Sequence, residues 1–210
     1  MRLGLLIIVL CFSFLGIAQE SDTSQQKDNR LGFKAGVNFS KFQPDDYPYE
    51  FESITGFYAG AFYQVKLDDK FYFKPELLFS IQGSGITIRD IPIPLVLASS
   101  YDFDFEVYDY AITTVLAGRW NFIDKFYLNS GLQFNFIVDQ KFQSDGNLLT
   151  GTGFGLTYED GESLEIGVNV GLGYQITDNI AFLVSGFQGF TGRNGDAKSR
   201  IYQFGFEYTL

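Results

Sequence analysis

The sequence predicts an all-β fold, an eight-stranded antiparallel up-and-down transmembrane β-barrel, and three observations lead to this prediction. Eight segments alternate apolar and polar residues with a period of two, as expected of strands whose two faces meet different surroundings. Short turns alternate with long connections between these segments. An apolar run typical of exported proteins precedes them. Together they indicate the outer membrane of a Gram-negative bacterium.

Residues 1–18 are predicted to be a secretory signal peptide. Arg2 precedes an apolar run from Leu3 to Ile17, and a small residue, Ala18, ends it before polar Gln19. The run is shorter than the ~20 apolar residues of a spanning helix, so a membrane anchor is the weaker alternative. Residues 19–30 (QESDTSQQKDNR) contain no apolar side chain and are expected to form a flexible periplasmic lead-in. Residues 31–210 then form one barrel domain.

The predicted strands have one face of large apolar side chains and one of glycine and polar side chains. They cover residues 31–42, 54–67, 71–82, 108–122, 126–138, 163–176, 180–188 and 199–210. The phase of 180–188 is ambiguous, and Pro75 predicts a bulge or local break because it lacks an N–H donor. The aromatic face is too bulky for an eight-stranded interior, so we expect it to meet lipid. A soluble sandwich or lipocalin-like barrel would reverse this orientation.

The connections predict which end of the barrel faces which compartment. Residues 68–70, 123–125 and 177–179 form short turns, whereas residues 43–53, 83–107, 139–162 and 189–198 form long loops. Bacterial outer-membrane barrels have short periplasmic turns and longer extracellular loops, so both termini are expected to be periplasmic. An aromatic girdle is expected near the short turns, formed by Tyr63, Phe71, Trp120, Phe126, Tyr174 and Tyr208.

The polar face carries balanced charges. An eight-stranded barrel is just wide enough to be filled by side chains, so charges inside it must pair. We therefore predict a lumen ion-pair network, with a proton or ion path as the alternative. Its members are Lys34, Lys66, Lys74, Glu76, Asp109, Arg119, Glu165 and Glu207.

The predicted loops are acidic, holding 14 of the 25 acidic residues and only four basic ones. An anionic rim suits divalent cations next to lipopolysaccharide, because calcium and magnesium prefer oxygen ligands. The candidate metal site is Asp102, Asp104 and Glu106, which share one face if the segment is extended. The spacing matches no known calcium-binding loop, so it favours the alternative, in which these residues form a solvated face of the loop.

The composition excludes several functions. Histidine is absent, which argues against the general-base chemistry of barrel hydrolases and acyltransferases, so we expect no enzyme and no cofactor. A net charge of −10 argues against nucleic acid as a partner. The expected partners are outer-membrane lipid and lipopolysaccharide, the barrel assembly machinery during insertion and possible divalent cations at the loops. Other protein partners are not predicted.

Four segments of the chain resemble the PorT-like family of outer-membrane β-barrels. They are GFKAGVNFSKF (32–42), FYFKPELLFSIQGSG (71–85), LNSGLQFNF (128–136) and FGFEYTL (204–210). The chain departs from the family at Leu210, where many such barrels end in an aromatic residue. The resemblance implies the fold and the membrane. Our hypothesis is a non-enzymatic barrel whose long acidic extracellular loops serve surface interaction or envelope integrity. The alternative is a narrow transport or secretion-accessory barrel.

Overall fold

The computed structural model describes residues 29–43, 50–92, 100–144, 164–191 and 198–210. The predicted signal peptide and most of the lead-in lie outside these residues. Arg30, the last residue assigned to the lead-in, is the first residue of a strand. Among the described residues, no helix is long and apolar enough to cross a membrane.

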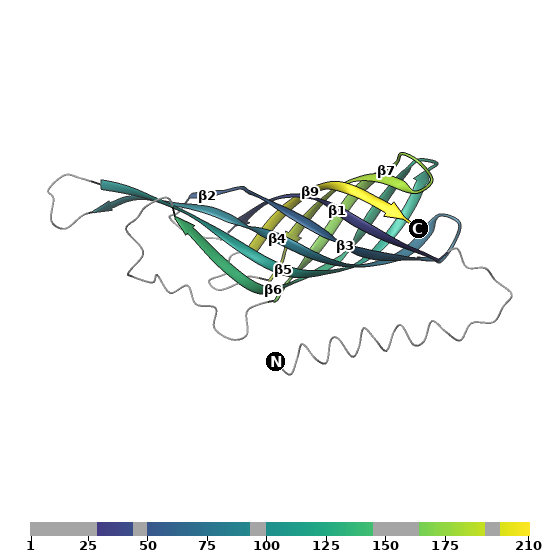
Figure 1. Ribbon diagram of the computed structural model, residues 1–210, viewed down its shortest axis with the longest axis horizontal. Coiled ribbons are helices and arrows are strands. Elements are labelled where there is room, and N and C mark those ends of the chain that lie inside the picture. The colour runs from purple at the N-terminus through teal and green to yellow at the C-terminus, as the bar shows by residue number, and fades with distance from the viewer. Residues whose placement is uncertain (1–28, 44–49, 93–99, 145–163, 192–197) are drawn as a thin grey trace, which may run out of the picture.

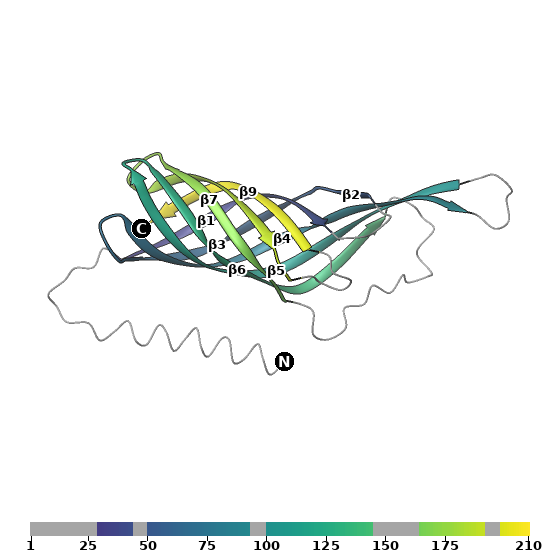
Figure 2. The ribbon, with the colours of Figure 1, turned by 180° about the vertical axis from the view of Figure 1, so that it is seen from behind.

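The described residues form one closed antiparallel sheet (Figures 1 and 2). Eight long strands pair with their neighbours in sequence, and the pairings of β1 with β9 and of β4 with β5 close the barrel. The predicted up-and-down barrel is therefore confirmed. Its strands are β1 (Arg30–Gln43), β3 (Ile54–Lys66), β4 (Phe71–Pro92), β5 (Ser100–Ile123), β6 (Phe126–Ser144), β7 (Leu164–Gln175), β8 (Ile180–Gly189) and β9 (Lys198–Thr209), with a short extra strand β2 (Glu50–Glu52) on β4.

The three short turns lie at one end of the barrel with the C-terminus (Figure 1). At the other end, the prediction of loops over 83–107 and 139–162 was wrong in part. Strand β4 continues to Pro92, β5 begins at Ser100 and β6 continues to Ser144. These segments pair with one another beyond the barrel wall. Their backbone N–H and C=O groups therefore form hydrogen bonds there, although the alternation of apolar and polar residues is weaker than in the wall.

Pro75 coincides with a local break and no bulge, the second of the two predicted outcomes. It pairs with Leu116 of β5 in an unshifted register, whereas the pairing of β3 with β4 skips Pro75 and Lys74 and resumes in the same register at Phe73. Proline lacks a backbone N–H, so at most one hydrogen bond to a neighbouring strand is lost, and the pairs on either side keep the strands in register. Register shifts occur elsewhere in the described sheet, between Ile88 and Ile91, between Tyr110 and Ala111, and between Asn121 and Ile123.

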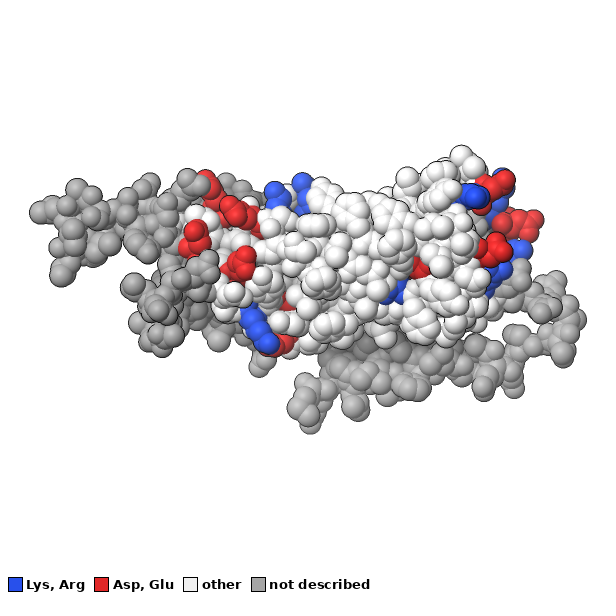
Figure 3. Space-filling model, turned by 45° about the horizontal axis from the view of Figure 1, so that its top comes forward, with Lys and Arg blue, Asp and Glu red and all other residues white. Residues whose placement is uncertain are grey.

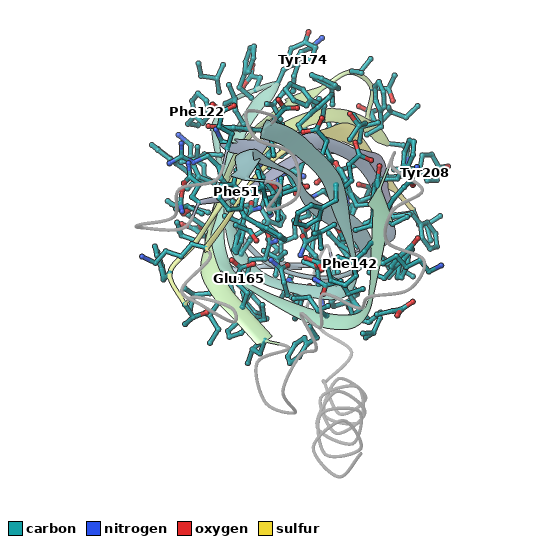
Figure 4. All side chains as sticks on the ribbon, turned by 90° about the vertical axis from the view of Figure 1, so that its left-hand side faces the viewer. Phe51, Phe122, Phe142, Glu165, Tyr174 and Tyr208 are labelled. Carbon is teal, nitrogen blue, oxygen red and sulfur yellow. The ribbon has the colours of Figure 1, made fainter. Side chains whose placement is uncertain are left out.

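Side-chain burial gives the orientation of the two faces. Phe57 is 62% exposed and Phe206 is 57% exposed, whereas Lys74 and Asn38 are fully buried. In Figure 4, Tyr174 and Tyr208 project outward. Figure 3 shows charged atoms gathered toward the two ends, with a belt of other side chains between them. The large apolar face points outward, as predicted. In β8, the ambiguous strand, Ala181, Leu183 and Ser185 face inward.

The outward face has the height of a bilayer core and an aromatic girdle near the turns. From Tyr110 to Trp120, β5 rises about 33 Å, or about 25 Å along the axis at a typical tilt of ~40°. Near the turns the rings of Phe71 and Trp120 stack at 6.0 Å, and those of Phe126 and Tyr174 lie 4.9 Å apart. All six residues of the predicted girdle are exposed.

The interior is less uniformly polar than predicted. Tyr58, Phe62 and Tyr127 are buried inside the barrel at 2% exposure or less. Each is paired directly with a glycine of the neighbouring strand, and a Cβ atom there would overlap the aromatic side chain. Glycines on the inward face therefore make the room that the interior aromatics need. The pairs are Gly36 with Tyr58, Gly32 with Phe62, and Gly173 with Tyr127.

Candidate functional site

A cluster of charged side chains occupies the half of the lumen near the turns. Lys34 Nζ lies 2.9 Å from Glu76 Oε2, and Lys74 Nζ lies 3.0 Å from Glu76 Oε1. Lys74 also bonds to Glu207 of β9 at 2.5 Å. None of these side chains is more than 3% exposed. Four of the eight predicted lumen residues therefore lie together, with the two lysines alternating with the two glutamates.

Glu207 also connects opposite walls of the barrel. Tyr127 of β6 donates a hydrogen bond from its hydroxyl to Glu207 Oε2 at 2.9 Å. The guanidinium of Arg119, on β5, lies 3.6 Å from the centre of the Tyr127 ring and 4.0 Å from Glu207. Strands β5 and β9 stand four strands apart around the closed sheet in either direction. Side chains from opposite walls therefore meet in the middle of the lumen.

Neutral side chains fill the middle of the lumen. Asn38 donates to Ser80 Oγ at 2.8 Å and accepts from Gln203 at 2.9 Å, which joins β1 to β4 and β9. On the other side, Asn169 donates to Gln133 at 2.8 Å and Gln133 donates to Asn135 at 2.9 Å. Burying these amides is tolerable because they bond to one another.

The remaining predicted lumen residues lie elsewhere. Glu165 is buried toward the loop end, where it accepts the backbone N–H of Ser199 at 2.6 Å (Figure 4). Asp109 is also fully buried at that end and accepts a hydrogen bond from Gln140 at 2.7 Å. Lys66 lies at the turn end, where its side chain is 32% exposed and pairs with Asp69 at 3.3 Å. The expectation that Lys66 is sealed in the lumen was therefore wrong, because β3 ends there.

The predicted metal ligands belong to one strand. Asp102, Asp104 and Glu106 all lie in β5, so their spacing places them on one face, although the side chain of Asp102 lies outside the described residues. Glu106 accepts a hydrogen bond from the Tyr108 hydroxyl at 2.7 Å, which raises the pKa of Tyr108. In the part of the chain that the structure describes, no three metal-binding side chains come together. The metal site stays a prediction.

The extension of β4 and β5 beyond the barrel has an acidic outer face. Registered rows place Glu50 beside Thr87 and Asp104, and Glu52 beside Gly85 and Glu106. Paired residues share a face of a sheet, so these four carboxylates point to the same side. In Figure 3 acidic side chains gather at this end of the molecule.

The inner face of the same extension is apolar. Phe51 pairs with Ile86, which pairs with Phe105, and this row continues the lumen wall above Val107. Figure 4 shows Phe51 and Phe142 within the outline of the barrel mouth. This reversal was not predicted from the sequence, although the sequence carries a signal for it. In β4 the large outward apolar residues up to Ile81 are odd-numbered, with Leu78 pointing inward, whereas the next apolar residues, Ile86 and Ile88, are even-numbered.

Residues 17–192 match a family model described as an outer membrane protein beta-barrel domain. The chain belongs to this family. It is thus a transmembrane β-barrel of the Gram-negative outer membrane, as its apolar belt and closed sheet require. The more specific PorT-like family is not what this model describes. No curated protein matches the chain.

Solved structures of other outer-membrane barrels are similar to this chain at low identity. Ail of Yersinia pestis is 13% identical over 87% of this chain and 99% of Ail, with a TM-score of 0.44. OprG from Pseudomonas aeruginosa is 14% identical over 90% of this chain and 99% of OprG, with a TM-score of 0.47. Neisserial surface protein A is 14% identical over 86% of this chain and 97% of its own, with a TM-score of 0.43. Such low identities are no evidence about function.

Proposed function

We propose that this chain is a non-enzymatic barrel with a side-chain-filled lumen, which presents an acidic extracellular extension for surface interaction. One observation carries the proposal. Side chains from opposite walls meet at Glu207, whereas β4 and β5 leave the barrel as a paired extension of about ten residues each. A barrel blocked in this way offers its outer surface, not its bore, for function.

The lumen contacts argue for a structural role of the buried charges. Lys74 lies between Glu76 and Glu207, and Lys34 pairs with the second oxygen of Glu76. A group that relays protons or passes ions needs water or a mobile partner, whereas these side chains bond to one another at full burial. The complete absence of histidine from the chain further favours a role without general-base catalysis and without a cofactor.

The proposal includes the direction of insertion. We assign the short turns and both ends of the barrel domain to the periplasm, because short turns are periplasmic in bacterial barrels. The predicted signal peptide and the resemblance to PorT-like barrels support this assignment. The acidic extension then projects from the cell surface, next to lipopolysaccharide.

The outer face of the extension suits a cationic partner. Its four carboxylates, Glu50, Glu52, Asp104 and Glu106, lie in two neighbouring rows of the same face. Such a face attracts basic polypeptides, and it attracts divalent cations that bridge to lipopolysaccharide. Surface interaction and envelope integrity are both served by this chemistry.

The test is a barrel without its extension. Residues 85–106 are replaced by Asn-Gly, a type I′ turn that joins Ser84 to Val107, its partner in the sheet. This removes Asp104 and Glu106 together with the segment of β4 that pairs with Glu50 and Glu52. A matched variant converts the four carboxylates to Gln. We expect both to fold, as judged by migration in electrophoresis before and after boiling, and both to lose binding of polylysine to cells or the barrier to a hydrophobic dye. Unchanged binding and an unchanged barrier in both variants contradict the proposal.

Single-channel recording in planar bilayers tests the blocked lumen separately. The side-chain-filled interior predicts no discrete conductance steps. The transport alternative predicts steps that persist after removal of the extension, and their observation would exclude the proposal.

A further inference from the structure

A small pocket opens at the turn end of the barrel. Its volume is about 250 Å³, below the range of ~300–1,000 Å³ that holds drug-sized ligands. Three cationic residues line it, Arg30, Arg119 and Lys125, against two acids, Asp124 and Asp178. It therefore has the size of a site for a small ion and a surplus of positive charge.

The charge of Arg119 is only partly neutralised in the described residues. The carboxylate nearest to it is Glu207, 4.0 Å away, and this carboxylate already binds Lys74 and Tyr127. The other bonds of Arg119 go to neutral amides, from Nε to Asn121 at 3.0 Å and from Nη2 to Gln175 at 3.2 Å. Because Arg119 is only 9% exposed, water screens its charge poorly.

Gln64 supplies an independent observation on the same pocket. It lines the pocket, is 5% exposed, and its Nε2 atom is buried without a hydrogen-bond partner in the described part of the chain. A buried donor without a partner is unfavourable, and such groups usually bond to water or a ligand. The pocket wall therefore combines an under-neutralised guanidinium with an unused amide donor.

We propose that this pocket binds a small oxyanion, a carboxylate or a phosphate, between Arg119 and Gln64. The oxyanion supplies the negative charge that Arg119 lacks and the acceptor that Gln64 lacks. Charge-assisted hydrogen bonds to a guanidinium are stronger than neutral ones, so Arg119 contributes most of the affinity. The exposed cations Arg30 and Lys125 attract the anion to the opening.

The experiment uses the full mature chain, labelled with ¹⁵N and folded in detergent micelles. The Arg119 Nε–H and the Gln64 side-chain amide are followed by NMR while sodium acetate or sodium phosphate replaces sodium chloride at constant ionic strength. We expect both resonances to shift and to saturate at millimolar anion. Comparing the acetate and phosphate titrations shows whether the site prefers a carboxylate or a phosphate.

Two variants and one control decide the outcome. Arg119→Gln is expected to weaken binding at least tenfold, as read from the Gln64 amide. Gln64→Leu, which changes no charge, is expected to weaken it several-fold, as read from Arg119. Lys141→Gln, at the loop end beside Tyr110, should change nothing. If Arg119→Gln does not fold, Gln64→Leu alone decides. Shifts that do not saturate, or that survive Gln64→Leu, mean an adventitious ion only and overturn the proposal.

Discussion

Strands β4 and β5 cross two environments, and their lower and upper halves have opposite polarity. Within the barrel wall Leu77 points outward at 58% exposure, and Lys74 points inward and is fully buried. Above Gly83 the outward positions include Thr87 and Asp104, and the inward face carries Ile86. In both halves the side chains alternate with a period of two, and β4 pairs with β5. The surroundings of the sheet, and not strand geometry, therefore decide which face is apolar, and we infer that the reversal marks the edge of the bilayer.

The largest expected effect comes from breaking the buried charges of the lower half. Lys74→Met removes the cation that lies between Glu76 and Glu207 and leaves both carboxylates less compensated at full burial. Breaking such a pair costs about 3–5 kcal/mol of unfolding free energy. Urea titration of the barrel in micelles, scored by heat-modifiable electrophoresis, measures it.

Lys66→Met is the matched control for this prediction. It breaks the exposed pair with Asp69, which should cost less than about 1 kcal/mol. An equal loss of unfolding free energy in the two variants would mean that water reaches the charges inside the barrel as readily as those at its turn end.

The next effect tests the reversal of polarity directly, with one substitution at two outward positions of β4. Leu77→Lys places a charge in the apolar belt, where it should cost about 2–4 kcal/mol. Thr87→Lys places the same charge on the extension and should change stability by less than about 0.5 kcal/mol. The same urea titration in lipid vesicles measures both. A similar loss of stability at both positions would contradict the inference that the bilayer ends near Gly83.

These two halves also explain how far the sequence could be read. Period-two alternation of large and small side chains was enough to predict the eight strands, their orientation and the short turns. It failed above Gly83, because the pattern expected of a lipid-facing wall, apolar outward and polar inward, is reversed there. The meeting of Arg119 and Tyr127 with Glu207 was also beyond prediction, since it depends on closure between strands far apart in sequence. The place of Lys66 depended on where β3 ends.

A smaller effect is expected where inward glycines receive aromatic rings. Gly173→Val puts side-chain atoms into the space of the Tyr127 ring and should cost about 1–3 kcal/mol. Gly118→Val, on the outward face of β5, meets only the backbone oxygen of Ser130 at an ordinary contact distance of 3.9 Å and should change stability by less than about 0.5 kcal/mol. Combining Gly173→Val with Tyr127→Ala should recover part of the loss relative to the sum of the single changes. Strict additivity would argue against the ring packing on the glycine.

The smallest expected effect lies in the aromatic girdle, where side chains pack against each other in lipid. Phe71 and Trp120 are directly paired, and their rings stack at an interplanar angle of 4°. A double-mutant cycle with Phe71→Leu and Trp120→Leu should give a coupling of about 0.5–1.5 kcal/mol. Leucine is apolar too, so the free energy of contact with lipid largely cancels in the cycle. The coupling then reports the contact between the two rings. A coupling near zero would mean that lipid replaces the ring contact completely, and that the girdle acts only by anchoring the barrel at the interface.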